Sequence, residues 1–275
     1  MRVAFLGPAG TFTEEALRAS APDGAEPVPY PTVYDTVMAV HDGGAERAVV
    51  PIENSLEGGV AATLDALATE ASDVRIVSEL IHPIHHCLIT RRAIGLDEIT
   101  RVISHPQAMS QCEALLRGEL AGAERVSSVS TAEAARRVAS SEEPWAALSS
   151  RLAGDLYGCV VLRESVEDSG DNETRFVWLA PAGEAPSEGG NKTSIVFWGF
   201  NDESPGALVN VLRELSDREI NLTRIESRPR RVGLGHYMFF ADLEGGSGEE
   251  PVADALRALG ERVEELRVLG SYAAA

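Results

Sequence analysis

The sequence predicts an α/β protein that ends in a smaller ferredoxin-like unit. Over the first 181 residues, short apolar runs alternate with amphipathic segments of helical length, a pattern typical of helices that cover mostly parallel sheets. Beyond this region the order becomes strand, helix, strand, strand, helix, strand, which is the order of a ferredoxin-like plait. Between the two parts, residues 182–193 are rich in Gly, Pro, Ser and Glu and have little to bury, so they are predicted to form a linker.

The larger part begins with an apolar strand that is closed by Gly7-Pro8. Thr11 or Thr13 is then expected to cap the first helix, because acidic residues follow in its first turn. Further helices are expected over 32–43, 57–70, 106–120, 130–140 and 149–158. Strands are expected over 2–7, 47–52, 75–90 as two runs, 101–104, 145–150, 159–168 and 174–181.

The smaller part is predicted to span residues 194–272. Its first helix starts at a proline, Pro205, which suits the first turn of a helix. The expected strands are 193–201, 221–230, 235–245 and 265–272, and the expected helices are 205–219 and 251–263. This fold by itself names no function.

The charge and composition exclude several classes of function. The formal net charge is −19, and nucleic-acid binding depends on clustered Lys and Arg, so a nucleic-acid partner is not expected. The one lysine, Lys192, lies in a polar stretch, which argues against Schiff-base chemistry, a pyridoxal-phosphate lysine or a P-loop. No cofactor fingerprint is present, and we expect no cofactor.

The cysteines and histidines do not form a metal-binding pattern. Three scattered cysteines without a C-x-x-C pair are typical of a reducing cytosol. His82, His85 and His86 are crowded, but alternation along a strand sends neighbours to opposite faces, so we interpret them mainly as structural and keep a zinc site as a minor alternative. The chain enters a strand at once and has no long apolar segment, so we expect no membrane association and a cytoplasmic location.

Four polar segments follow strands or begin them in the larger part. They are GPAGTFTEEA at 7–16, PIENSLEGG at 51–59, ISHPQAMSQCEALL at 103–116, and the sequence Thr174-Arg175-Phe176 after the loop DSGDNE. Taken singly, each is better explained by a turn, a helix cap, an exposed polar face or an edge strand. Because ligands of open α/β sheets gather at strand ends, four such segments together predict a cleft for a small polar organic acid.

The ordered set of motifs resembles a known family. GPAGTFTEEA, PIENSLEGG, SHPQAMSQC and GDNETRF, followed by a plait that carries GALVNVL and ESRP, are similar to prephenate dehydratase with a C-terminal ACT regulatory domain. The resemblance implies a catalytic domain over 1–181 with two lobes, the second roughly 78–170, built like type II periplasmic binding proteins. An ACT domain over 194–272 follows.

The same resemblance implies an activity and a set of site residues. Members convert prephenate to phenylpyruvate, water and carbon dioxide for L-phenylalanine synthesis. Thr174 would donate a hydrogen bond to the departing C4 hydroxyl, and Arg175 would hold a carboxylate in its planar fork. Phe176 would pack behind the site, and Glu53 would serve as an acid if burial raised its pKa. The remaining expected contacts are Asn54, Ser104 and Gln111, with Ala9, Gly10, Thr11, Ser55 and Gln107 as further substrate-binding positions.

The plait is expected to regulate the enzyme. The resemblance implies that L-phenylalanine binds between subunits of a dimer or a dimer of dimers and shifts a two-state equilibrium. The sign of this regulation stays open. The expected effector-binding residues are Gly206, Ala207, Leu208, Glu226, Ser227, Arg228 and Pro229. Two alternatives to prephenate dehydratase also stay open, an arogenate dehydratase and a non-catalytic small-molecule sensor.

Overall fold

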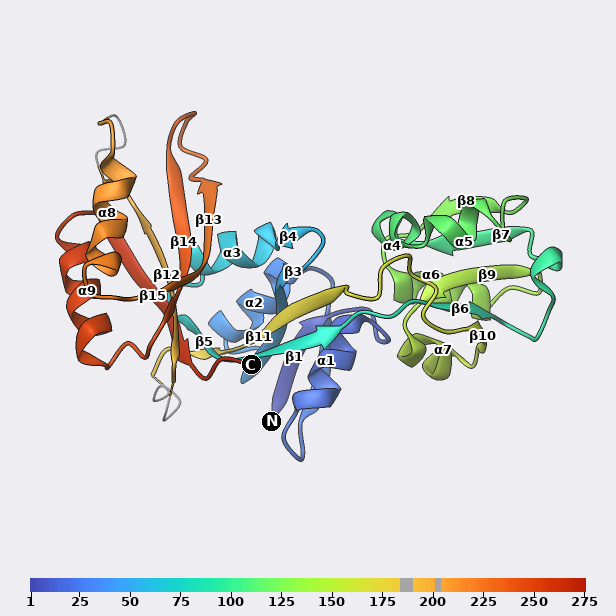
Figure 1. Cartoon of the computed structure of the whole chain (residues 1–275). Helices are drawn as coiled ribbons and strands as arrows, with labels where there is room; N and C mark the ends of the chain where they lie inside the picture. Colours follow the sequence, from blue (N-terminus) through green and yellow to red (C-terminus); the bar gives the residue numbers. More distant parts are fainter. Residues whose placement is uncertain (184–189, 201–203) are drawn as a thin grey trace.

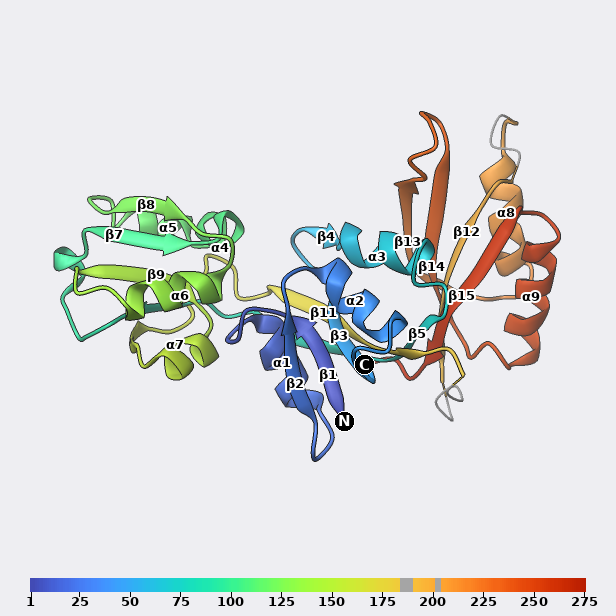
Figure 2. The same ribbon diagram turned by 180° about the vertical axis from the view of Figure 1, so that it is seen from behind.

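The computed structural model describes residues 1–183, 190–200 and 204–275. Three α/β units follow one another in an elongated molecule, with the C-terminal plait at one end, the first lobe in the middle and the second lobe at the other end (Figure 1). The view from behind shows the same row of units (Figure 2). The predicted α/β class with a two-lobed first part and a terminal plait is confirmed.

The first lobe is built on the strand order β5-β11-β3-β1-β2. Its strands are β1 (Arg2–Leu6), β2 (Glu26–Tyr30), β3 (Arg47–Asn54), β4 (Gly58–Gly59, paired with β3), β5 (Val74–Pro83) and β11 (Glu173–Pro181). Its helices are α1 (Phe12–Ser20), α2 (Val33–His41) and α3 (Ala61–Ala68). Thr11 caps α1, because its side chain accepts a hydrogen bond from the Glu14 N–H. The sequence analysis missed β2, whose two prolines are tolerated because it is an edge strand.

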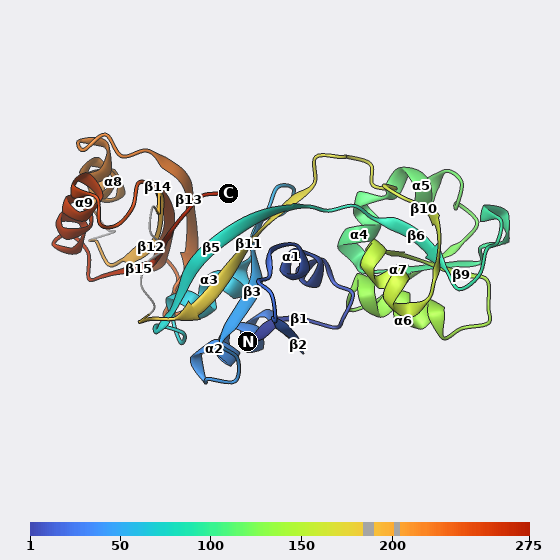
Figure 3. The ribbon, with the colours of Figure 1, turned by 90° about the horizontal axis from the view of Figure 1, so that it is seen from below.

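The second lobe is a separate sheet of order β10-β6-β9-β7-β8. Its strands are β6 (Cys87–Thr90), β7 (Arg101–Ser104), β8 (Glu124–Ser127), β9 (Trp145–Ser149) and β10 (Val160–Arg163). Its helices are η1 (Leu96–Glu98), α4 (Pro106–Gln111), α5 (Glu113–Arg117), α6 (Thr131–Ala139) and α7 (Arg151–Tyr157). The chain crosses between the lobes twice, from β5 to β6 and from β10 to β11 (Figure 3).

Three details differ from the sequence-based expectation. The sheets are mixed rather than mostly parallel, because β11 runs back from the second lobe and pairs antiparallel with both β3 and β5. The predicted helix 106–120 is interrupted at Cys112, whose backbone has φ −122° and ψ 31°. The predicted strand 159–168 ends at Arg163, before an acidic stretch with little to bury.

The terminal unit has the predicted order strand, helix, strand, strand, helix, strand. Its elements are β12 (Lys192–Trp198), α8 (Ala207–Ser216), β13 (Leu222–Pro229), β14 (Tyr237–Glu244), α9 (Glu250–Gly260) and β15 (Glu265–Tyr272), with the sheet order β13-β14-β12-β15. Side chains alternate along β12, so Ile195 and Phe197 pack with α8 and α9 while Val196 faces the first lobe. Both faces of this sheet are therefore buried.

The plait and the first lobe share one core. Val196, Phe240 and Tyr272 of the plait belong to the same buried cluster as Val37 of α2 and Leu64 of α3. The two sheets also join edge to edge, where β15 pairs with β5 at Gly270 and Ile76. A methyl group at Gly270 would collide with the Ile76 backbone, so the close approach requires glycine.

The predicted unit limits, 1–181, 78–170, 182–193 and 194–272, stay predictions. Part of the predicted linker, 184–189, and the end of the predicted strand 193–201 lie outside the described residues. Within the described ranges, none of the helices has the length and hydropathy needed to cross a membrane.

Candidate active site

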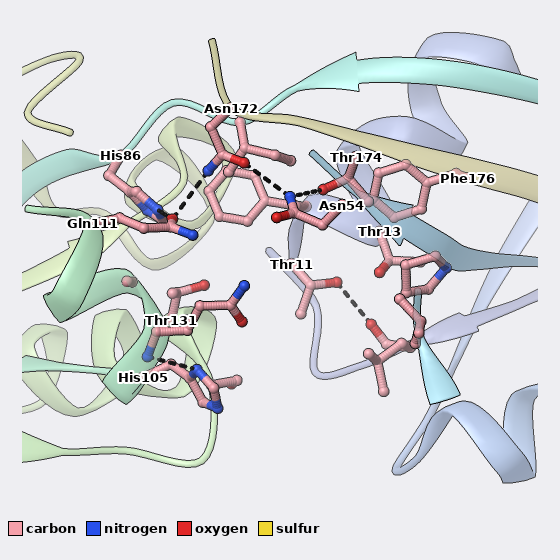
Figure 4. A pocket seen from close by; sticks show the side chains of 18 of the residues that line it. Thr11, Thr13, Asn54, His86, His105, Gln111, Thr131, Asn172, Thr174 and Phe176 are labelled. Carbon is pink, nitrogen blue, oxygen red and sulfur yellow. Dashed lines mark hydrogen bonds between the residues drawn. The ribbon is translucent and has the colours of Figure 1, made fainter. Parts of the chain in front are cut away.

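A pocket of about 340 Å³ lies between the two lobes of the larger part. Strand ends and helix starts from both lobes contribute its walls (Figure 4). The polar side chains at its lining are Thr11, Thr13, Asn54, His86, His105, Gln107, Gln111, Ser130, Thr131, Asn172 and Thr174. Phe176 closes one side and contacts His82 edge-on, with ring centroids 6.3 Å apart.

Asn54 fixes the orientation of Thr174. The backbone N–H groups of Leu56 and Glu57 donate to Asn54 Oδ1, each over 3.1 Å, so the amide nitrogen must point the other way. That nitrogen donates to Thr174 Oγ1 over 2.9 Å. An amide NH₂ cannot accept a hydrogen bond, so the hydroxyl hydrogen of Thr174 is left for another acceptor.

A second amide pair continues this chain across the pocket. Asn54 Nδ2 donates to Asn172 Oδ1 over 2.8 Å, and Asn172 Nδ2 donates to Gln111 Oε1 over 3.0 Å. Asn172 precedes β11 in the first lobe, whereas Gln111 ends α4 in the second lobe. The amide chain therefore bridges the two lobes at the pocket.

The pocket combines apolar walls with uncharged polar groups. Among the described residues that line it, none is Lys, Arg, Asp or Glu. Burial lowers the pKa of His86 below its usual value, so this imidazole is neutral at physiological pH. A ligand here meets hydroxyls, amides and imidazoles rather than ion-pair partners.

Two nine-residue helices begin at this pocket. Thr11, Phe12 and Thr13 form the start of α1, and Ser130 and Thr131 form the start of α6. The first backbone N–H groups of a helix have no intrahelical acceptor, and the helix dipole favours negative charge at this end. The N–H groups of both helix starts can donate to an anion, although Glu14, Glu15 and Glu133 in the same first turns reduce the attraction of these helix ends for negative charge.

Arg175 and Glu53 do not lie in the pocket, which corrects their expected roles in substrate binding and acid catalysis. Side chains alternate along a strand, so Thr174 and Phe176 face the pocket while Arg175 lies on the opposite face of β11. Arg175 Nη2 lies 3.1 Å from Glu53 Oε2 and 2.7 Å from Asp242 Oδ2, and Nη1 lies 3.1 Å from Glu79 Oε2.

These contacts make a buried cluster of charges between the first lobe and the plait. Burial alone would lower the pKa of Arg175, but the groups around it, chiefly Asp242 with contributions from Tyr272 and Glu53, together more than offset this, so its pKa lies above the usual value. Lys192 of the plait also reaches Glu79, over 2.5 Å. We name Glu53, Glu79, Arg175, Lys192 and Asp242 the interface charge cluster.

Four more predicted residues lie outside the pocket. Ser104 Oγ donates to the Leu148 carbonyl over 2.7 Å inside the second sheet, and Ser55 Oγ donates to the Asp171 carbonyl over 3.1 Å. The carbonyls of Ala9 and Gly10 accept hydrogen bonds from Tyr157 and Ser150, over 2.8 and 2.7 Å, and so tie the lobes together. Each of these residues orders the walls rather than lining the pocket.

The structure brings in residues that the sequence analysis did not select as functional. They are Thr13, His86, His105, Ser130, Thr131 and Asn172. Asn172 could have been found, since it stands two residues before Thr174 in the loop that leads into β11. His86 was interpreted as structural, and only the fold reveals that it faces the pocket.

The expected effector-binding residues fall in two places of one chain. Gly206, Ala207 and Leu208 border a pocket of about 300 Å³, together with the rings of Phe200, Tyr237 and Phe239. Arg228 instead pairs with Asp65 of α3, over 2.9 Å, and Glu226 pairs with Arg224. Pro229 borders a different pocket beside α3. Ser227 pairs with Phe239 in the β13–β14 register.

Fold and site together define a class of protein. An inter-lobe pocket lined by hydroxyls, amides and imidazoles, in a two-lobed α/β unit that is joined to a plait, is the arrangement of an enzyme that acts on a small polar molecule and carries a second domain.

Comparison with known proteins gives the family. A family model described as prephenate dehydratase matches residues 3–184, and a model described as ACT domain matches residues 194–261. The chain belongs to the prephenate dehydratase family, and it is a hydro-lyase. It is 41% identical to prephenate dehydratase of Amycolatopsis methanolica over 276 residues, which covers 100% of this chain and 89% of the relative.

Two solved structures are similar over nearly the whole chain. One is prephenate dehydratase of Arthrobacter aurescens in complex with L-Phe, at a TM-score of 0.90 and 39% identity, covering 99% of this chain and 90% of the other. The second is described as a novel type of quorum-quenching acylase, at a TM-score of 0.88 and 34% identity, covering 100% and 98% of the two chains.

Proposed function

We propose that the chain converts prephenate to phenylpyruvate in the inter-lobe pocket, with Thr174 as the catalytic residue, and that L-phenylalanine bound to the plait regulates this reaction. The observation that carries the catalytic part is the hydrogen bond from Asn54 to Thr174 Oγ1. It leaves the Thr174 hydroxyl hydrogen available to a substrate oxygen.

The bond changes define what the pocket must supply. The ring carboxylate leaves as carbon dioxide, its electron pair enters the ring, and the C4–O bond breaks. The departing oxygen takes up one proton and leaves as water, and the ring becomes aromatic. Negative charge therefore moves from the carboxylate to the leaving oxygen, where a hydrogen-bond donor stabilises the transition state.

Thr174 is suited to hold that leaving oxygen. A hydrogen bond accepted by its oxygen from Asn54 polarises the hydroxyl and strengthens it as a donor. A threonine hydroxyl is a weak acid, so its role is to position and hydrogen-bond the leaving group rather than to act as the acid itself.

The uncharged lining is consistent with decarboxylation. An Arg or Lys beside the ring carboxylate would stabilise the charged ground state more than the neutral carbon dioxide that leaves, and would slow the step. The starts of α1 and α6, with their free N–H groups and hydroxyls, supply weaker anchors for the carboxylates.

The same lining favours prephenate over arogenate. Arogenate carries an ammonium group, which would need a carboxylate partner when removed from water. The described lining of the pocket has none. Comparison of kcat/KM for the two substrates tests this, and preferred turnover of arogenate would contradict it.

The similarity to an acylase raises a second possibility, which the hydrogen bonds do not support. An acylase nucleophile needs an adjacent base. His105 Nδ1 instead accepts from the Gln107 N–H over 3.3 Å, and burial raises the pKa of the Cys112 thiol to about 12. In the described part of the pocket, no hydroxyl is hydrogen-bonded to an imidazole.

L-phenylalanine regulation is proposed from the plait pocket and the relative that binds L-Phe. Gly206 has φ +81°, a conformation that favours glycine, and precedes the ten-residue helix α8, whose Ala207 N–H donates to the Ser204 carbonyl over 3.1 Å. The next N–H groups of this first turn have no intrahelical acceptor and can donate to a carboxylate. The aromatic rings of Phe200, Tyr237 and Phe239 can pack around an apolar side chain.

In one chain the second group of expected effector residues, 226–229, lies outside this pocket. This separation is consistent with a site completed by a second copy, and we propose a homodimer or homotetramer. Analytical ultracentrifugation with and without L-phenylalanine tests the assembly, and monomers under both conditions would contradict it.

The interface charge cluster offers a path between the two sites. Asp242 of the plait binds Arg175, whose backbone neighbour is Thr174. A movement of the plait that displaces Asp242 would move Arg175, and through the backbone it would change the position of the Thr174 hydroxyl. Gly206→Val is expected to remove the response of turnover to L-phenylalanine and to keep the basal rate. Gly248→Val, at a glycine with open space and ordinary backbone angles, serves as the matched control.

A further inference from the structure

His86 is a buried imidazole that faces the pocket and takes no part in the reaction as proposed above. Only 2% of its surface is exposed, and the ring of Phe12 packs against it edge-on, with centroids 5.3 Å apart. Its Nε2 atom lies 2.9 Å from Gln111 Oε1. Its Nδ1 atom is buried and has no hydrogen-bond partner among the described residues.

The chain of amides beside His86 has one possible direction. It starts at the backbone N–H groups of Leu56 and Glu57, which can only donate, and this fixes Asn54 Oδ1 as the acceptor. Asn54 Nδ2 faces three acceptors, Asn172 Oδ1 over 2.8 Å, the Glu173 carbonyl over 3.1 Å and Thr174 Oγ1 over 2.9 Å. Asn172 turns its oxygen to this nitrogen, because an NH₂ group there could not accept, and its own nitrogen therefore donates to Gln111 Oε1.

The direction of these hydrogen bonds determines the tautomer of His86 and the orientation of the Gln111 amide. Gln111 Oε1 is already an acceptor, so His86 Nε2 must carry a hydrogen and donate it. Both donors bind the same oxygen of Gln111. Its amide NH₂ is therefore turned away from them and is directed into the pocket (Figure 4).

We propose that His86, held as the Nε2–H tautomer, is a positioning residue that presents the Gln111 NH₂ group to a carboxylate of the substrate. This inference rests on the proposed function. A flipped Gln111 amide would place its carbonyl oxygen against the carboxylate and repel it. Asn172 and His86 together prevent the flip, because either donor would face an NH₂ group if it occurred.

The tautomer can be measured directly in the wild-type protein. Long-range ¹H–¹⁵N correlation spectra of ¹⁵N-histidine-labelled protein distinguish the two neutral tautomers, and the His86 signals are assigned from their loss in His86→Gln. We expect hydrogen on Nε2. Hydrogen on Nδ1 would overturn the inference, whatever the kinetics of the variants show.

Kinetics test the consequence for binding. His86→Leu is expected to raise KM for prephenate about tenfold, the factor typical for one hydrogen bond to a charged group, and to leave kcat within about twofold. His86→Gln, which keeps a hydrogen-bond donor near the Nε2 position, should have a KM close to that of the wild type. His41→Leu, at a half-exposed site on α2 outside the pocket, is the control and should match the wild type.

The outcomes separate this inference from the function on which it rests. A folded wild type that does not consume prephenate would overturn the proposed function. Wild-type turnover with an unchanged KM in His86→Leu would overturn only the role of His86. A fall in kcat with unchanged KM would also overturn it, because a purely structural defect reduces the active fraction without changing KM.

Discussion

The two faces of β11 differ sharply in charge. Thr174 and Phe176 face a pocket whose described lining has no Lys, Arg, Asp or Glu, whereas Arg175 between them binds three carboxylates in the interface charge cluster. The strand β11 thus separates the inter-lobe pocket from the interface charge cluster between the first lobe and the plait.

The difference teaches that the positive charge of Arg175 lies away from the pocket, although a substrate with two carboxylates would be expected to need a cationic side chain there. With a net charge of −19 the whole protein repels the substrate at long range. Under the proposed function, oriented amides, hydroxyls and helix starts would hold the substrate, whereas the guanidinium of Arg175 pairs with Asp242 of the plait. The predictions below test each side of this contrast.

The largest effect is expected from Arg175→Met. Removal of the guanidinium leaves Glu79 and Asp242 buried with one partner fewer, so the free energy of unfolding should fall by about 3–5 kcal/mol. Urea denaturation measures the change. Arg136→Met, at an exposed pair with Glu133, should change it by less than about 1 kcal/mol, and an equal effect of the two variants would contradict the contrast.

Thr174→Val is expected to act on the rate instead. The valine side chain keeps the shape of threonine but has no hydroxyl to donate to the leaving oxygen. We therefore expect kcat to fall by about 10²–10³-fold, the range found when an enzyme loses one hydrogen-bond donor to its transition state. Steady-state kinetics measure this. Thr174→Ser should retain most of the activity, and a Thr174→Val rate within tenfold of the wild type would remove Thr174 from its role.

Gly270→Ala tests the second joint between the plait and the first lobe. The new methyl group collides with the Ile76 backbone, so unfolding should become easier by about 1–3 kcal/mol, and the response of turnover to L-phenylalanine should weaken. Gly260→Ala, where the nearest atom lies 4.0 Å away, is the matched control. A normal response to L-phenylalanine in Gly270→Ala would show that this joint is not needed for coupling.

The smallest effect is the response to salt. If the pocket holds the substrate without ion pairs, added KCl screens the long-range repulsion and should lower KM by roughly two- to fivefold between low and physiological ionic strength. Sucrose at equal osmolality controls for solution effects. A KM that rises with KCl would mean that a cationic group binds the substrate directly.

The sequence predicted most of the elements and the pocket, but not which face each site residue occupies. The helix over 11–20 and the strand around Thr174 follow from local patterns, and their observed positions agree. The strand over 26–30 was missed because its two prolines mask the pattern of an edge strand.

Arg175 and His86 show why the rest could not be predicted. Alternation along a strand places Arg175 opposite Thr174, but the carboxylates of Glu79 and Asp242 that meet Arg175 come from other strands and are brought to it only by folding. His86 looks like its neighbour His85, but it enters the pocket because β6 begins beside Gln111 of another element. Both assignments require contacts between distant parts of the chain.

The most direct test is phenylpyruvate formation from prephenate, followed by its absorbance in alkali, with and without L-phenylalanine. We expect turnover by the wild type, a rate that changes with L-phenylalanine, and near loss of turnover in Thr174→Val. Absence of turnover by protein that circular dichroism shows to be folded would contradict the assignment of the neutral pocket as a prephenate dehydratase site.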